Sequence, residues 1–247
     1  MEKWFDPKFE NNYRRYTRKR LGGFSLENFL RKFSVTTWII IINIIVFIFA
    51  LLFMGIFGSD KILSFLALQP VAFFNGAIWT LLTSMFMHGN FTHLLVNMIS
   101  LFFLGNFVEK LIGRKRFFWL YMISGIVAGL FFVFLAYFLG NTDFGARIFG
   151  SPDIYAVGAS GAIFAIAGLL AVLTPKLRVY VFFVIPMQMW TAVVFLLVVL
   201  WAASIGAGLP FGNTAHFGGL LVGVVYALYL RNKYRRKTQL IARYFSG

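Results

Sequence analysis

Runs of apolar residues long enough to cross a lipid bilayer are the feature that most constrains this sequence. A helix needs about 20 apolar residues to cross a hydrocarbon layer of roughly 30 Å. The first such run, at 38–57, reads WIIIINIIVFIFALLFMGIF. Five further runs lie at about 92–112, 117–139, 160–174, 187–205 and 215–230. We therefore expect an all-α, polytopic membrane protein with six transmembrane helices.

The composition agrees with a membrane protein. Of the 247 residues, 60% are hydrophobic and 13% are charged. In a soluble domain about half of the residues are apolar and about a quarter are charged. The net charge is +15, but the basic residues lie at the edges of the apolar runs. That placement favours contact with the lipid bilayer over binding of nucleic acid. The chain has no cysteine, which excludes disulfides, thiolate nucleophiles and zinc–sulfur sites.

The basic residues also predict how the spans are oriented. Of the 23 lysines and arginines, nine precede the first span, four lie between the second and third, two follow the fourth and six follow the sixth. These 21 fall on one face of the membrane, whereas only Lys61 and Arg147 fall on the other. The positive-inside rule then makes both termini cytoplasmic. We see no cleavable signal peptide and expect a prokaryotic plasma membrane.

The chain divides into three regions on this interpretation. Residues 1–37 form a basic cytoplasmic tail, residues 38–230 the membrane domain, and residues 231–247 a second basic cytoplasmic tail. Within the first tail, residues 24–33 have apolar side chains at helical spacing, which fits either an interfacial helix or a solvated segment. Residues 140–157 carry Gly, Pro, Asp and Asn and are predicted to form a loop.

Five polar residues lie near the outward starts of the second, fourth and sixth spans. They comprise all three histidines, one asparagine and one serine, namely His88, His93, Asn97, Ser160 and His216. Polar groups inside a membrane are costly and usually face the bundle interior or a water-filled cavity. We therefore expect the five to share one polar pocket.

The length of the fourth span predicts the depth of Ser160. A helix from Ser160 to Thr174 is about 20 Å long, which is about 10 Å less than the hydrocarbon layer. If the Pro175 end lies at the cytoplasmic boundary, Ser160 lies well below the outer surface. The preceding loop must then enter the protein, which is allowed only where it is buried or lines a cavity.

The residue types in this pocket suit nucleophilic catalysis. A serine hydroxyl needs a neighbouring base, and histidine is the usual one. The one acidic residue of the spans, Glu109, lies at the cytoplasmic end, so a Ser-His dyad is possible and a triad is not. The donors available to an oxyanion are Asn97, His93 and the backbone N–H of Ser160. Each residue alone also fits a structural role in helix packing.

Three motifs resemble the rhomboid family of intramembrane serine proteases. They are HGNFTHLLVN at 88–97, GASG at 158–161 and AHFGGLLVG at 215–223. The resemblance implies that Ser160 is the nucleophile and His216 the base. It also implies that His93 and Asn97 line the oxyanion site, with Gly158, His88 and Phe164 lining the active site beside them. It further implies cleavage of single-span or multi-span membrane proteins near their outer end, without cofactor or metal. Independently of the resemblance, a short contact between the serine and histidine helices needs glycine at the crossing, and Gly161, Gly219 and Gly223 could supply it.

Two positions depart from the pattern of the family. Trp79 is followed by Thr80, where the family often has Trp-Arg. Phe164 stands where many members carry tyrosine against the histidine, and it keeps the ring while losing the hydroxyl. Glu109 resembles the acidic residue that closes the second span in the family.

Other functions remain open on the sequence. A rhomboid-like protein can bind membrane clients without cutting them, although such relatives usually lose the serine or the histidine. Histidines can relay protons in a transporter or channel, but no acidic residue lies in the middle of a span. The three histidines His88, His93 and His216 would suffice to hold zinc. The sequence predicts neither the substrate nor the oligomeric state.

Overall fold

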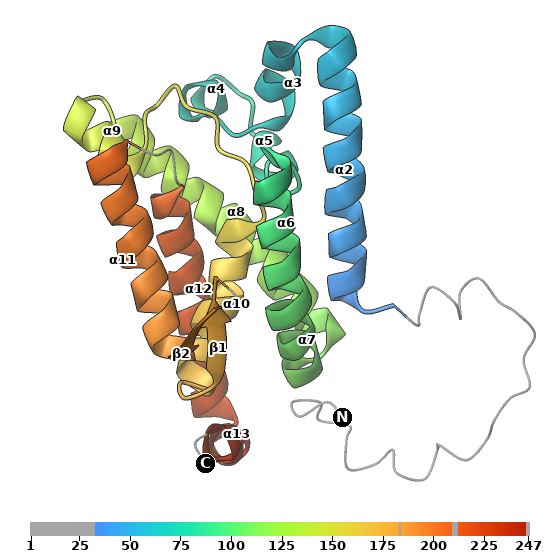
Figure 1. The fold of residues 1–247 in the computed structure, drawn as a ribbon, viewed down its shortest axis with the longest axis vertical. Helices are drawn as coiled ribbons and strands as arrows, with labels where there is room; N and C mark the ends of the chain where they lie inside the picture. The colour runs from blue at the N-terminus through green and yellow to red at the C-terminus, as the bar shows by residue number, and fades with distance from the viewer. Residues whose placement is uncertain (1–32, 183, 209–211, 246–247) are drawn as a thin grey trace, which may run out of the picture.

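The structure is a computed structural model that describes residues 33–182, 184–208 and 212–245. It is mostly helical, with long helices side by side in one bundle (Figure 1). These are α2 (Val35–Phe57), α8 (Arg114–Leu139), α11 (Met189–Ala207) and α12 (Asn213–Lys233), and a rod made of α6 (Phe91–Ser100), the π-helix η2 (Leu101–Gly105) and α7 (Asn106–Ile112). The predicted interfacial segment 24–33 falls almost wholly outside the described residues.

Five helical stretches of the described chain are long and apolar enough to cross a membrane. They are Val35–Phe57, Phe91–Ile112, Arg114–Leu139, Met189–Ala207 and Asn213–Lys233. The sixth predicted span is the apolar helix α10 (Ser160–Leu173), which has 14 residues. A largely helical, multi-pass membrane protein is thus confirmed, while the count of six spans stays a prediction.

Helix α10 lies at the centre of the bundle, against α8, α11 and α12. Ten of its 14 residues are buried, because small side chains let the neighbouring helices approach closely. A methyl group at Gly168 would lie 2.8 Å from the carbonyl oxygen of Leu220 on α12. The short helix is therefore held by its neighbours rather than by lipid.

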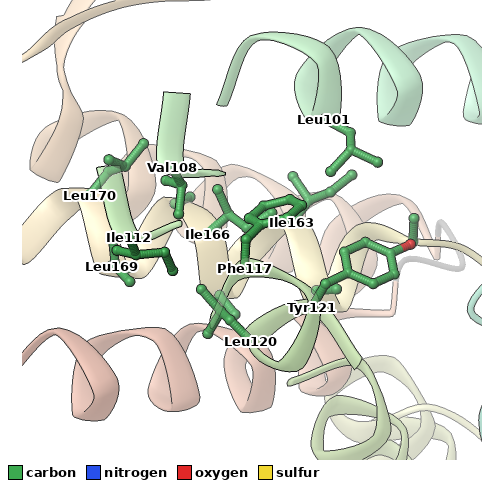
Figure 2. Close-up of a cluster of buried hydrophobic side chains, with 14 of the residues drawn as sticks. Leu101, Val108, Ile112, Phe117, Leu120, Tyr121, Ile163, Ile166, Leu169 and Leu170 are labelled. Atoms are coloured by element: carbon green, nitrogen blue, oxygen red, sulfur yellow. The ribbon is translucent and has the colours of Figure 1, made fainter. Parts of the chain in front are cut away.

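One hydrophobic cluster fills the bundle around α10. Figure 2 shows side chains of η2, α7, α8 and α10 gathered there. Phe117 and Tyr121 of α8 are fully buried in it, as are Ile166, Leu169 and Leu170 of α10. This packing fixes α10 relative to α8, which sets the position of the residues at the start of α10.

A buried carboxylate fastens the beginning of α2. Glu109 of α7 accepts hydrogen bonds from the backbone N–H groups of Val35 and Thr36, at 2.9 and 2.8 Å, and from the Thr36 hydroxyl. A negative charge at a helix N-terminus is stabilised by the free N–H groups and the helix dipole. Glu109 therefore links α7 to α2 at the end of the bundle opposite Ser160.

Short elements occupy both ends of the bundle. Helices α3 (Ser59–Leu66), α4 (Pro70–Phe74), α5 (Thr80–Thr83) and α9 (Asp143–Phe149) lie at one end in Figure 1, and α13 (Arg235–Tyr244) lies at the other. The segment after Leu230 is therefore helical over most of its described length. Ile241 and Thr238 on α13 are buried.

The structure differs from the sequence-based expectation at two of these elements. The loop predicted at 140–157 contains α9, because the Thr142 hydroxyl accepts from the Gly145 N–H at 3.0 Å and caps a helix that ends at Gly150. The expected all-α fold also contains a two-stranded antiparallel hairpin, β1 (Arg178–Val181) and β2 (Ile185–Gln188). It connects α10 to α11, where we expected only a connecting segment.

Candidate active site

Ser160 is the first residue of α10, and the chain descends to it from α9 along an irregular segment (Figure 1). Ala156 in this segment forms an antiparallel bridge with Leu68, and the Gly158 N–H donates to the Ser84 carbonyl at 2.9 Å. Backbone groups inside a membrane bundle need such partners. Leu68 and Ser84 could not be found from the sequence, because they contribute through backbone groups that no side-chain pattern reveals.

The serine meets a histidine of α12 across the helix contact. The distance between Ser160 Oγ and His216 Nε2 is 2.8 Å, which is a hydrogen bond. His216 is buried, and its Nδ1 has no hydrogen-bond partner within the described residues. Phe164, one turn after the serine, stacks on the imidazole with ring centroids 4.5 Å apart and planes 20° apart. The imidazole is thus held between a hydroxyl and a ring.

Two glycines of α12 allow this close approach. A methyl group at Gly219 would lie 1.9 Å from the carbonyl oxygen of Gly161, and one at Gly223 would lie 1.9 Å from that of Ala165. Both distances are far below van der Waals contact, so larger residues would push α12 away from α10. Gly161 itself faces Ala128 of α8, where a methyl group would lie 2.6 Å from the alanine Cβ.

The backbone before the serine meets the polar side chains of α6. Gly158 has φ +125°, which an L-residue rarely adopts. A methyl group there would lie 2.8 Å from His93 Nε2 and 3.5 Å from Asn97 Nδ2. Asn97 is buried, and its Nδ2 has no partner in the part of the chain that the structure describes. The Asn97 amide therefore lies beside the backbone of Gly158, two residues before Ser160, where it can donate to a bound oxygen.

His88 lies beside His93 and makes no hydrogen bond to Ser160. Its ring centroid is 5.1 Å from that of His93, with the rings edge to face. It is 3% exposed, and within the described chain neither ring nitrogen has a hydrogen-bond partner. The structure thus brings Ser160, His216 and Phe164 together, and places Gly158, His93, Asn97 and His88 next to them.

The departure at Thr80 has a local structural account. The Thr80 hydroxyl donates to the Ala77 carbonyl at 2.6 Å, and the residue is fully buried. The Trp79 indole donates to the Phe65 carbonyl at 2.9 Å. Thr80 thus closes a turn of the segment between α3 and α6, and Trp79 ties this segment to α3. The same segment carries the Ser84 carbonyl that bonds to Gly158.

The histidines do not form a metal-binding cluster with one another. Within residues 33–182, 184–208 and 212–245, no three His, Cys, Asp or Glu side chains are arranged to hold a metal ion. Zinc sites in proteins need three or four such ligands around the ion. The described geometry therefore favours the serine–histidine pair over the metal-site alternative.

Comparison with known proteins finds relatives that are similar in sequence to this chain. The chain is 32% identical over 174 residues to "Rhomboid protein 1, mitochondrial" of Saccharomyces cerevisiae, a match that covers 67% of this chain and 47% of the yeast protein. It is 28% identical to "Putative rhomboid protease YdcA" of Bacillus subtilis, with 59% of this chain and 65% of that protein covered. It is also 28% identical to "Rhomboid protease AarA" of Providencia stuartii, with 79% and 72% covered.

The chain spans about half to two thirds of the length of several of these relatives. These relatives come from yeast and bacteria, and a further one, "RHOMBOID-like protein 5", comes from the plant Arabidopsis thaliana, so the expected prokaryotic membrane stays a prediction. The rhomboid domain matches residues 75–233, which include Ser160, His216 and the segment from His88 to Asn97. With motifs, helical bundle and domain match in agreement, this chain belongs to the rhomboid family.

Proposed function

We propose that the chain is an intramembrane serine endopeptidase in which Ser160 is the nucleophile and His216 the general base. The 2.8 Å distance between Ser160 Oγ and His216 Nε2 is the observation that carries the proposal. The apolar helices around this pair support a reaction inside the membrane. Relatives named as rhomboid proteases support it as well.

The proposed reaction needs only groups of this site and one water. His216 Nε2 accepts the proton of Ser160 while Oγ attacks the carbonyl carbon of the peptide. Asn97, His93 and the backbone N–H of Ser160 donate to the oxyanion that forms. The C–N bond then breaks, and His216 passes the proton to the leaving amine. A water activated by His216 hydrolyses the acyl-enzyme and restores the Ser160 hydroxyl.

We propose single-span or multi-span membrane proteins as substrates, cut near their extracytoplasmic end. The proposed orientation has six spans, with both termini in the cytoplasm. It is supported by the distribution of Lys and Arg, since only Lys61 and Arg147 fall on the opposite face from the other 21. In this orientation Ser160 begins α10 on the extracytoplasmic side.

Labelling with a fluorophosphonate tests the nucleophile directly. The full chain in detergent should react at Ser160, and both Ser160→Ala and His216→Ala should abolish labelling and cleavage of a membrane-protein substrate. The two losses should not add, because residues that act as one unit give non-additive effects.

Ser124→Ala is the matched control. Ser124 is a buried serine on α8 whose hydroxyl already donates to the Leu120 carbonyl, and its variant should label like the parent. Cleavage that survives in Ser160→Ala would overturn the proposal. Unlabelled parent protein that still binds membrane clients would favour the inactive, client-binding alternative.

A further inference from the structure

A polar cleft lies where α12 meets α13, at the end of the bundle remote from Ser160. It has a volume of about 590 Å³ and is lined by Leu228, Arg231, Asn232, Arg235 and Gln239. Two guanidinium groups and two amides provide many N–H donors, and none of the described residues that line the cleft is acidic. Arginine donors in this combination suit the oxygens of a phosphate group.

Among the described residues, the two arginines of the cleft have no partner of opposite charge. No acidic residue follows Asp153 in the sequence, whereas six Lys or Arg follow Leu230. The nearby Lys233 and Arg116 donate to tyrosine hydroxyls, at 2.8 and 3.1 Å. Arg231 and Arg235, by contrast, make no side-chain hydrogen bond or ion pair with any described residue. No described residue therefore compensates their charge, which suits the binding of an anion.

An apolar stripe on α12 leads into the cleft. Leu221, Val225 and Leu228 are 37%, 64% and 43% exposed. Their spacing of four and three residues puts them on one face of the helix, and Asn232 continues that face by one more turn. An exposed apolar stripe that ends in a basic cleft matches a molecule with a hydrocarbon chain and an anionic head.

The cleft lies at the level expected for lipid headgroups. The last candidate span ends at Lys233, between the two arginines in sequence. Helix α13 lies across the base of the bundle and is drawn nearly end-on in Figure 1. Ile241 on its inner face is buried, and the ring of Phe245 meets that of Phe107 at 5.5 Å. Packing thus holds the basic residues of α13 beside the end of the candidate span, where we expect the boundary between hydrocarbon and water.

From these observations we propose that the cleft binds the phosphate of an anionic phospholipid. Arg231 and Arg235 contact the phosphate, Asn232 and Gln239 donate to headgroup oxygens, and an acyl chain lies along the stripe that ends at Leu228. The site is independent of the proposed proteolytic chemistry, because none of its residues lies near Ser160. The lipid would stabilise the junction of α12 and α13.

Native mass spectrometry of the full chain in detergent, with added phosphatidylglycerol, tests the proposal. Arg231→Gln with Arg235→Gln should weaken retention of the lipid roughly 10- to 30-fold. The control, Arg236→Gln with Lys237→Gln, removes the same charge from exposed positions of α13 outside the cleft. It should change retention by less than about threefold. An equal loss in both double variants would mean diffuse attraction to a basic helix and would overturn the proposal.

Three further ligands distinguish lipid from other sources of phosphate. Phosphatidylcholine should bind at least about tenfold more weakly than phosphatidylglycerol, because its head has no net charge. Soluble glycerophosphoglycerol and inorganic phosphate should not displace the lipid at equal concentration. Equal binding of the two lipids would show that the headgroup charge does not matter and would overturn the proposal. Displacement by the soluble anions would show a site for phosphate alone, and would overturn the proposed binding of a lipid. A thermal unfolding curve for each variant verifies that it is folded.

Discussion

At position 158, both the backbone conformation and the surrounding space require glycine. Its φ of +125° is a conformation that side chains disfavour, and the space where a Cβ would stand is filled by His93. The same backbone turn sends the N–H of Gly158 to the Ser84 carbonyl and leads the chain into α10. A residue with no side chain thus positions both Ser160 and the neighbouring donors.

Asn97→Ala tests the proposed oxyanion donor. If the Asn97 amide acts mainly on the transition state, kcat should fall by about 10²–10³, with little change in KM. Steady-state cleavage in detergent, normalised to folded protein, measures both constants. Residual activity should exceed that of Ser160→Ala, because other donors remain. Unchanged turnover together with a stability loss of about 1–3 kcal/mol would instead assign Asn97 a purely structural role.

At the scale of elements, the contact between α10 and α12 depends on glycine. Gly219→Ala should destabilise the fold and lower activity, since its Cβ would lie 1.9 Å from a backbone oxygen that cannot move freely. We expect a loss of stability of about 1–3 kcal/mol from overpacking. Thermal unfolding in detergent and fluorophosphonate labelling measure the two effects.

Gly55→Ala on α2 is the matched control for that contact. No atom lies within 4 Å of the position its Cβ would take, and alanine favours a helix over glycine by about 0.5–1 kcal/mol. The control should keep activity and unfold at the same or a higher temperature. A stable, active Gly219→Ala protein would contradict the close packing of α10 against α12.

Glu109→Gln tests the fastening of α2. The substitution keeps the size of the side chain and removes the charge that accepts from Val35, Thr36 and the Thr36 hydroxyl. Hydrogen bonds to a charged group contribute about 1.5–3 kcal/mol each, so we expect a clear drop in unfolding temperature. The control is Asp60→Asn, in the first turn of the exposed helix α3. It should lower the free energy of unfolding by less than about 1 kcal/mol. Equal effects would show that Glu109 has no special role.

The long helices could be predicted from the sequence because lipid imposes a length and a polarity that apolar runs display. Helix α9 and the hairpin were missed because each is made by local capping and pairing among mixed residues. Ser160, His216, His93 and Asn97 stood out as polar residues in apolar runs. The stacking of Phe164 and the bridge between Leu68 and Ala156 depend on tertiary contacts. Such contacts leave no periodic pattern in the sequence, so they could not be predicted from it.

The orientation of the whole molecule is testable because the chain has no cysteine. Cysteine at Lys61 should react with an impermeant maleimide added outside intact cells, and cysteine at Lys115 should react only after the membrane is permeabilised. Both positions are exposed, so reactivity reports the side of the membrane. The opposite pattern would place the start of α10 on the cytoplasmic side and overturn the proposed orientation.

The distance in sequence between Ser160 and His216, 56 residues, has a consequence for biosynthesis. A ribosome has completed α10 well before α12 emerges, and α10 alone is about 21 Å long, too short to settle across the bilayer without its neighbours. The proposed nucleophile therefore has no base until the last long helix has been translated and inserted. On the proposed mechanism, an unfinished copy of this chain could not yet cleave other nascent membrane proteins at the insertion machinery.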